Sequence, residues 1–376
     1  MILRRSSIEI QAREGGIYLP EIDLWLDPRG NENNAFISHA HADHFSRPKK
    51  AFCSPETAFL LMSRFGNPAE SLEIISWEEV RAMDGWEIRL LPAGHIVGSA
   101  MLHLTRLSDD ATLLYTGDFK TQFSRTCRAA ISRKSEVLVM ETTYGKPNFV
   151  FPAREDTEAA ILQFVSDTLM DGNIAVLCAY ALGKAQEVAA LLSEHGIEMV
   201  LHPSVLAMHE ACRELGLDLP EGILWEERVP KGHVVVCPPN TIRSQRLRRL
   251  KNRRTAMVSG WGIHPSARYR YQVDKVFPLS DHADHQELLD FVDQVDPQLV
   301  YTVHGATREF AAELRTGGYT AWSLFSEDQL ELEGFSTQIS VERAAKVVSI
   351  SEDRPLSRLN ESLNKISVSS SRLRKR

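Results

Sequence analysis

A short histidine-rich segment near the N-terminus constrains this chain more than any other feature. Residues 39–44 read His-Ala-His-Ala-Asp-His and directly follow the apolar, strand-like run at 35–38. Zinc and similar ions prefer imidazole nitrogen with some carboxylate oxygen as ligands. The chain has 13 histidines among 376 residues, so a chance cluster in a polar loop is the weaker alternative. Alternate side chains of an extended segment point to one side, and the spacing therefore predicts a site for two neighbouring metal ions.

Three more candidate ligands follow later apolar runs. They are His95, Asp118 and His304, and each stands near the end of a strand-like segment with a glycine beside it. A glycine there lets the backbone turn. Taken singly, each residue reads more naturally as a turn or capping residue. As a set with the segment at 39–44, they predict that distant parts of the chain converge on one metal site.

The succession of these motifs resembles the metallo-β-lactamase superfamily. The first four motifs of that superfamily correspond here to Asp27-Pro28, residues 39–44, His95 and Asp118, and its last metal ligand to His304. Three further segments, at 140–145, 179–187 and 279–285, resemble motifs of the β-CASP nucleases. Together with Ser259-Gly-Trp, they are most similar to the bacterial ligase-associated DNA exonucleases, relatives of the endonuclease of pre-mRNA 3′-end cleavage. The resemblance covers roughly residues 8 to 330.

The resemblance implies two zinc ions per chain, with manganese as an alternative because the same ligands accept it. One ion would be held by His39, His41 and His95, and the other by Asp43, His44 and His304, with Asp118 bridging both. Asp27 would orient ligand imidazoles by hydrogen bonds. A plain Asp-Pro turn is an equally open interpretation of that residue, and Asp23 is a competing candidate.

Hydrolysis of a phosphodiester also requires a proton for the leaving oxygen. Two metal ions about 3.5–4 Å apart activate a water and neutralise phosphate charge, but they do not supply that proton. By resemblance, His282 is the general acid, since imidazole ordinarily titrates near pH 7. Glu141 would fix its tautomer and favour its protonated form. With Asp43 and Asp118, these two residues form the predicted catalytic set.

The remaining charged residues of the segment at 279–285 have a simpler interpretation. Asp281, Asp284 and His285 read as the solvated start of a helix over 286–292. We therefore assign them no part in catalysis at this point.

The resemblance implies a metal-dependent nuclease that hydrolyses DNA, trimming from a 3′ end in DNA repair, in association with a DNA ligase or helicase. RNA processing by the same chemistry, hydrolysis of a small molecule, and an inactive binding subunit remain alternatives. The segments around Glu141, Lys184 and His282 favour a nuclease, because a small-molecule hydrolase would not need them. The choice between DNA and RNA stays open, since no base-stacking aromatic motif is visible in the sequence.

The net charge of −7 is unusual for a protein that binds a polyanion. One segment, 243–254, nevertheless holds seven cations and no acid. Leu247 and Leu250 are spaced as the inner face of a helix, with the cations outside. The candidate phosphate contacts of this run are Arg243, Arg246, Arg248 and Arg249, and plain solvated surface is an equally open interpretation. Lys184, at the expected N-terminus of a helix, is a second candidate contact.

Short strands up to about residue 145, followed by longer alternating units such as a strand at 174–178 and a helix at 184–194, predict an α/β protein. We expect a metallo-β-lactamase αββα sandwich at 1–147 and 273–345, with a β-CASP α/β cap inserted at 148–272 and a flexible basic tail at 346–376. No run of about 18 apolar residues is present, so no membrane association is expected. Five cysteines without a C-x-x-C pair, and an N-terminus without an apolar signal core, favour the cytoplasm. The oligomeric state stays undetermined.

Overall fold

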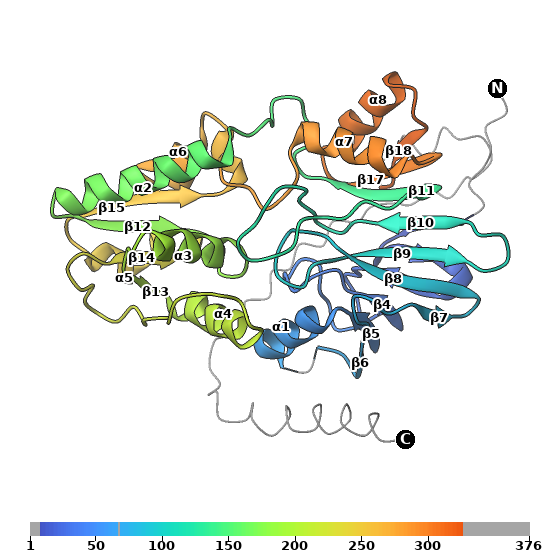
Figure 1. The fold of residues 1–376 in the computed structure, drawn as a ribbon, viewed down its shortest axis with the longest axis horizontal. Coiled ribbons are helices and arrows are strands. Elements are labelled where there is room, and N and C mark those ends of the chain that lie inside the picture. Colours follow the sequence, from blue (N-terminus) through green and yellow to red (C-terminus); the bar gives the residue numbers. More distant parts are fainter. Residues whose placement is uncertain (1–7, 67, 326–376) are drawn as a thin grey trace. The chain divides into compact units, whose positions relative to one another are not determined.

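The computed structural model describes residues 8–66 and 68–325, which belong to one compact unit. The predicted tail at 346–376, and the last part of the predicted 273–345 segment, lie outside the described residues. Within the described ranges the chain forms three sheets flanked by helices (Figure 1). The predicted α/β class is therefore confirmed.

Two of the sheets form the first lobe. The six-stranded sheet runs β1 (Gln11–Arg13), β2 (Gly16–Leu19), β3 (Leu24–Leu26), β4 (Asn34–Phe36), β5 (Lys50–Cys53) and β6 (Ser71–Ile74). The seven-stranded sheet runs β18 (Ala321–Ser323), β17 (Leu299–Gly305), β11 (Val137–Thr142), β10 (Thr112–Tyr115), β9 (Ala100–Arg106), β8 (Trp86–Pro92) and β7 (Arg81–Met83). Their helices are α1 (Pro55–Phe65), α7 (His285–Val295) and α8 (Thr307–Thr316), with a short 3-10 turn, η1 (Pro20–Ile22).

Strand alternation explains why this lobe has four layers. Phe36 and Tyr115 pack in a core between the two sheets. The neighbouring residue Leu114 points the other way and packs with Phe291 of α7. On the other side, α1 packs on the outer face of the six-stranded sheet. Its Leu61 belongs to the same buried apolar cluster as Ile37. Because successive strand side chains alternate, each sheet is apolar on both faces, and the result is an αββα sandwich.

The third sheet, which we call the cap sheet, is wholly parallel. Its order is β13 (Met199–Leu201), β14 (Val234–Cys237), β12 (Ile174–Cys178), β15 (Arg253–Val258) and β16 (Lys275–Phe277). Its helices are α2 (Arg154–Met170), α3 (Lys184–Glu194), α4 (Pro203–Glu214), α5 (Gln245–Arg249) and α6 (Ala267–Tyr271), with the 3-10 turns η2 (Pro239–Arg243) and η3 (Gly260–Ile263). Alternate residues of β12 belong to separate cores on its two faces, as a doubly covered sheet requires.

Most of the predicted elements of this region are present. The predicted strand at 174–178 and helix at 184–194 coincide with β12 and α3. Leu247 and Leu250 are buried, as predicted for the inner face of the basic run. One boundary differs, because β16 pairs with β15 and the cap sheet therefore extends past residue 272 to Phe277. Within the described ranges, no helix is both long and apolar enough to cross a bilayer.

Candidate metal centre

The predicted ligands stand at strand ends that meet at one edge. β10, β11 and β17 are parallel neighbours, so their carboxyl ends lie together. Asp118 follows β10, while His304 lies near the end of β17. Gly94 and Gly117 have φ angles of 77° and 54°, which confirms that the backbone turns beside the ligands. A Cβ on Gly94 would lie 2.2 Å from the Lys120 carbonyl oxygen, so a larger residue does not fit.

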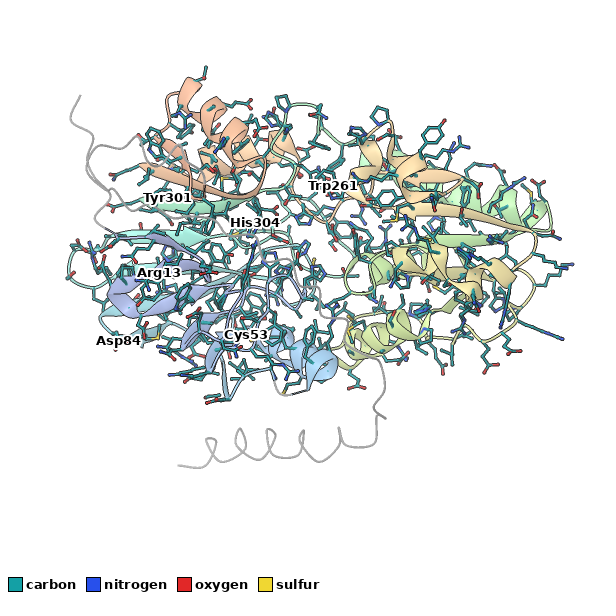
Figure 2. The ribbon with its side chains drawn as sticks, turned by 180° about the vertical axis from the view of Figure 1, so that it is seen from behind. Arg13, Cys53, Asp84, Trp261, Tyr301 and His304 are labelled. Atoms are coloured by element: carbon teal, nitrogen blue, oxygen red, sulfur yellow. The ribbon has the colours of Figure 1, made fainter. Side chains whose placement is uncertain are left out.

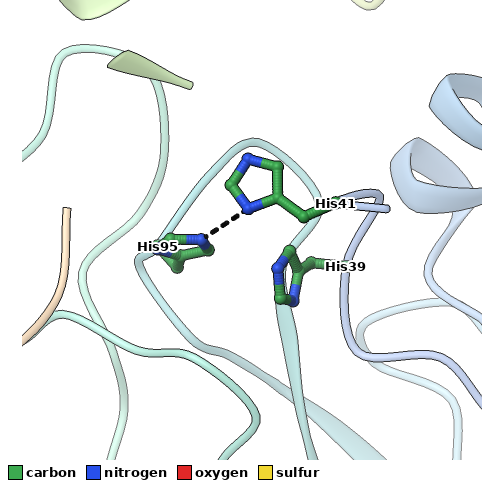
Figure 3. A group of neighbouring side chains, drawn as sticks. All are labelled: His39, His41 and His95. Atoms are coloured by element: carbon green, nitrogen blue, oxygen red, sulfur yellow. Dashed lines mark hydrogen bonds between the residues drawn. The ribbon is translucent and has the colours of Figure 1, made fainter. Parts of the chain in front are cut away.

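Three imidazoles form the first donor group (Figure 3). His39, His41 and His95 each offer a ring nitrogen, and these atoms lie within 4.8 Å of one another. His41 Nδ1 and His95 Nε2 are 3.0 Å apart. The ring centroids of His39 and His95 are 4.7 Å apart and nearly perpendicular. The structure thus brings together the three residues predicted to hold one ion.

Asp118 connects this group to a second one. Its Oδ2 lies 3.2 Å from His44 Nε2 and 3.8 Å from the Nε2 atoms of His39 and His95. Asp27, His39 and His44 form another group of donors within 4.8 Å, and so do His95, Asp118 and His282. The position of Asp118 between the groups is the one expected of a bridging carboxylate.

Asp27 holds the loop that carries the histidines. Its carboxylate accepts hydrogen bonds from Ser38 N at 2.7 Å, Ser38 Oγ at 2.5 Å and Tyr115 Oη at 2.8 Å. It also lies 3.0 Å from His44 Nδ1, so the other nitrogen of that ring faces Asp118. The competing candidate Asp23 is exposed and accepts from Tyr18 at 2.9 Å. Asp27 is therefore the residue placed to orient a ligand imidazole.

The donor set fits a divalent cation. His39 Nε2 is buried without a hydrogen-bond partner, although it points toward Asp118. A buried polar atom without a partner is costly, and a bound cation would satisfy it. Burial lowers the pKa of four imidazoles, which keeps them neutral with a free lone pair. These four are His39, His41, His95, whose pKa falls to about 3, and His304.

His44 differs from the other imidazoles. Burial disfavours its charged form, but Asp118 and Asp27 outweigh burial and raise its pKa well above the usual value. A protonated His44 can therefore donate to Asp118 across 3.2 Å and offset the charge of this carboxylate. Neutral imidazole and ionised carboxylate are ligand types that zinc and manganese accept.

Two predicted ligands lie at the margin of these groups. Asp43 is exposed and belongs to none of the three-donor groups among the described residues. His304 is also outside them, but its ring centroid is 5.2 Å from that of His44. Its φ of 55° is a left-handed conformation that is uncommon for histidine. The second predicted ligand set is therefore only partly assembled.

The predicted acid and its partner are in direct contact. His282 Nδ1 lies 2.9 Å from Glu141 Oε1, and the imidazole ring centroid is 4.5 Å from that of His95. Glu141 is held in turn by Phe119 N at 2.8 Å and by the Thr143 hydroxyl. Burial opposes protonation of His282, but the Glu141 carboxylate outweighs it and raises the pKa of His282 to about 9. The imidazole can therefore carry a proton at neutral pH.

The residues around His282 correct two predictions. Asp281 is less solvated than predicted, since its side chain is only 19% exposed and its carboxylate lies 3.0 Å from the ammonium of Lys184. Lys184 is only 2% exposed, so it does not offer an open phosphate contact as predicted. Asp284 does cap α7 as expected, accepting from Glu287 N, but Asp284 and His285 are buried rather than solvated.

The basic run lies largely away from this centre. It begins after β14 and ends at the start of β15, so it crosses from the carboxyl ends of the cap strands to their amino ends. Arg243, Arg248 and Arg249 are exposed. Arg246 instead lies over the Trp225 ring, with Cζ 4.7 Å from its centroid. The placement favours solvated surface for much of the run.

Several residues that support the site were not singled out from the sequence. Ser38 and Tyr115 hold Asp27, and Lys120 donates to the Ser280 carbonyl oxygen at 2.7 Å. Arg125 joins the first lobe to the cap helices, through Glu158 at 2.5 Å and Glu194 at 2.8 Å. Ser38 and Lys120 are adjacent or nearly adjacent to predicted ligands, which is the signal that could have identified them.

Comparisons with known proteins agree with this geometry. Residues 267–323 match the family described as "Zn-dependent metallo-hydrolase RNA specificity domain". The chain is 40% identical over 321 residues to "Probable DNA ligase" from Opitutus terrae, covering 84% of this chain and 31% of that protein.

Two more distant relatives are an "RNase J-like protein" and a DNA repair protein. The first, from Methanocaldococcus jannaschii, is 28% identical over 50% of this chain and 52% of its own length. "DNA cross-link repair protein SNM1" from Arabidopsis thaliana is 25% identical over 73% of this chain and 62% of its own length. The chain thus spans less than two thirds of each of these three relatives. On this likeness and the motifs that the structure assembles, the chain belongs to the β-CASP family of the metallo-β-lactamase superfamily.

Proposed function

We propose that this chain is a dinuclear zinc-dependent nuclease that hydrolyses DNA, trimming from a 3′ end in DNA repair. The contact of 2.9 Å between His282 and Glu141, directly beside His95, is the observation that carries the proposal. A protonated imidazole next to a cluster of metal donors is what cleavage of a phosphodiester requires. Simple metal binding would not need it.

Each part of the site has a separate task in this reaction. Bound divalent ions lower the pKa of water and neutralise charge on the phosphate. His39, His41 and His95 would hold one ion, and Asp118 would reach toward a second one near His44. Glu141 keeps Nδ1 of His282 engaged, so Nε2 is the atom that can donate a proton to the leaving oxygen. Low-dielectric surroundings strengthen this pairing.

DNA is favoured over RNA by the relatives that match most of the chain. The names of two of them refer to DNA ligation and DNA cross-link repair. RNA is the alternative, supported by the description of the matching family and by the name of the "RNase J-like protein". We also propose that this chain acts with a DNA ligase, because one relative unites a region like this chain with a longer protein of that name.

The test is an assay on end-labelled substrates. Purified protein, loaded with Zn²⁺ or Mn²⁺, is incubated with single- and double-stranded DNA and RNA labelled at either end. We expect a ladder that begins at the 3′ end of DNA and disappears with EDTA. The variant Asp118→Asn, which removes the charge shared by the donor groups, is the inactive control. Faster cleavage of RNA would establish the alternative, and intact substrates under every condition would refute a nuclease.

A further inference from the structure

The segment that follows Asp118, residues 119–126, joins the first lobe to the cap. We call it the linking segment. In Figure 2 Trp261 is seen on the side of the cap that lies toward His304 of the first lobe. The linking segment contains two cations and no acid, whereas α3 of the cap carries Glu187 and Glu194. The two surfaces are therefore complementary in charge.

The first half of the linking segment holds the surroundings of His282. The main-chain N–H of Phe119 donates to the Glu141 carboxylate at 2.8 Å. The ammonium of Lys120 donates to the Ser280 carbonyl oxygen at 2.7 Å. The partner of the candidate acid and the backbone before it are therefore held by residues that directly follow a predicted metal ligand.

The second half of the linking segment holds α3. The Glu187 carboxylate accepts three hydrogen bonds from it, from Ser124 Oγ at 2.8 Å, Arg125 N at 3.0 Å and Thr126 Oγ1 at 3.2 Å. Burial disfavours the charge of Glu187, but Arg154 of α2 and the Arg125 amide outweigh burial and lower its pKa. The carboxylate is therefore charged at neutral pH and accepts strong hydrogen bonds.

The side chain of Arg125 binds two more carboxylates of the cap. Its guanidinium donates to both oxygens of Glu158 on α2, at 2.5 and 3.0 Å. Its Nε donates to Glu194 on α3 at 2.8 Å. A planar guanidinium that forms such pairs fixes direction as well as distance. Arg125 therefore ties both helices to the first lobe in a defined position.

Helix α3 connects this position to His282. Lys184 lies one turn before Glu187 on the same helix and pairs with Asp281, the neighbour of the candidate acid, at 3.0 Å. A helix is rigid over one turn, because main-chain hydrogen bonds connect residues four apart. A displacement of α3 at Glu187 would therefore move Lys184 and, through Asp281, the imidazole.

We propose that Arg125 is a positioning residue for the reaction, which holds α3 where His282 can deliver its proton to the leaving oxygen. The inference rests on the proposed function and adds a residue whose side chain binds carboxylates of the cap. Catalysis depends steeply on such placement, since a displacement of about 1 Å can cost about 100-fold in rate. Arg125 thus acts on the acid from a distance, through the helix that it holds.

The experiment compares two kinds of leaving group on one strand. The first substrate is a single-stranded oligodeoxynucleotide. The second is the same strand with sulfur in place of a bridging oxygen, prepared separately for the 3′ and the 5′ position so that the leaving atom is included. A thiolate leaves without a proton, because thiols are far stronger acids than alcohols. The sulfur strand therefore reports cleavage that needs no general acid.

The variants of the zinc-loaded full chain are Arg125→Met, Arg125→Lys and His282→Ala. The matched control is Arg106→Met, on β9 of the first lobe. The Arg106 guanidinium also joins two carboxylates, Glu21 at 2.6 Å and Asp109 at 2.7 Å. Its side chain is 14% exposed, as is that of Arg125. The control thus removes an equally buried guanidinium that is not tied to the cap helices.

We expect Arg125→Met to lower kcat on the oxygen strand by about 10- to 100-fold and to leave kcat on the sulfur strand near the wild-type value. KM and zinc content stay near the wild-type values. Arg125→Lys, which can keep one of the two pairs, recovers part of the loss. His282→Ala shows the same selective loss to a larger extent, and Arg106→Met behaves as the wild type on both strands.

Equal losses on the two strands in Arg125→Met overturn the inference, because the residue would then support the fold or the metal centre. An unchanged kcat on both strands overturns it as well. If Arg125→Met does not fold, the same comparison in Arg125→Lys decides. A selective loss in His282→Ala alone leaves the proposed acid in place and overturns only this inference. A wild type that cleaves neither strand refutes the proposed function itself.

Discussion

Lys184 of α3 and Asp281 lie 3.0 Å apart, and this ion pair fastens the cap to the segment that carries His282. The main-chain oxygen of Asp281 also lies 2.9 Å from His95 Nδ1, so the same residue meets a candidate metal ligand. Lys120 holds the preceding carbonyl from the first lobe. The position of His282 is therefore set from both lobes.

Replacing Lys184 tests whether its ion pair with Asp281 stabilises the protein and positions His282. In Lys184→Met the partly buried Asp281 carboxylate loses its partner, which costs less than the roughly 3–5 kcal/mol typical of a fully buried pair. We expect a lower thermal midpoint and a lower kcat. The double variant Lys184→Met with Asp281→Asn, which removes both charges, recovers much of the stability. A single variant as stable as the wild type would contradict the pairing.

Replacing the candidate acid separates catalysis from metal binding. We expect His282→Ala to lower kcat by about 10²- to 10⁴-fold, since the leaving oxygen then lacks a positioned proton donor. Zinc content, measured by atomic emission, stays at the wild-type level. His233, which is partly exposed and belongs to none of the donor groups among the described residues, provides the control His233→Ala, which changes neither quantity. Loss of zinc in His282→Ala would instead make this residue a ligand.

The pH dependence of kcat reports the Glu141 contact. The pKa of His282 is raised to about 9, mainly because Glu141 outweighs the effect of burial. A general acid works only while protonated, so activity falls as the pH rises through its pKa. In Glu141→Gln the anionic partner is lost, and we expect the alkaline limb to move to lower pH. Bound metal cations move the alkaline limb to lower pH in both proteins. The measured quantity is therefore the difference between the pH profiles of the wild type and the variant.

Asp27 and Asp23 allow a matched comparison of two variants in zinc affinity. Both have left-handed backbone angles, with φ of 43° and 45°, so an asparagine is tolerated equally at either position. Asp27→Asn removes the charge that orients His44, and we expect zinc affinity to fall about 10- to 100-fold in a chelator competition. Asp23→Asn leaves the affinity unchanged. Equal effects of the two variants would contradict the role of Asp27.

Two basic segments of the cap, α6 and α5, lead to different predictions for how the KM depends on salt concentration. Neutralising Arg268 and Arg270 should flatten the dependence of KM on salt, because each phosphate contact to a single strand adds about 0.7 to the slope. Neutralising Arg248 and Arg249, on α5 of the cap, should change the slope less. Figure 1 shows α5 toward the other end of the cap strands. A larger change from the α5 pair would reverse this assignment and restore the basic run as the main phosphate contact.

Much of the site could be predicted from the sequence because its information is local. His39, His41 and His44 are within six residues, and strand periodicity places them at the end of β4. Glycines beside His95 and Asp118 mark the turns that follow strands. The ranges of β12 and α3 were predictable for the same reason, since apolar spacing and turn residues act over short distances.

Tertiary structure alone decided which distant residues meet and which are buried. His95 and Asp281 are 186 residues apart in sequence, and Glu141 and His282 are 141 apart. Lys184 read as an open cation from the sequence, yet it is buried against Asp281. The ring contact between Trp261 and Tyr144, with centroids 5.0 Å apart, likewise has no signal in the sequence. Such contacts depend on the order of strands and on how the cap packs against the first lobe, and no local pattern encodes either of them.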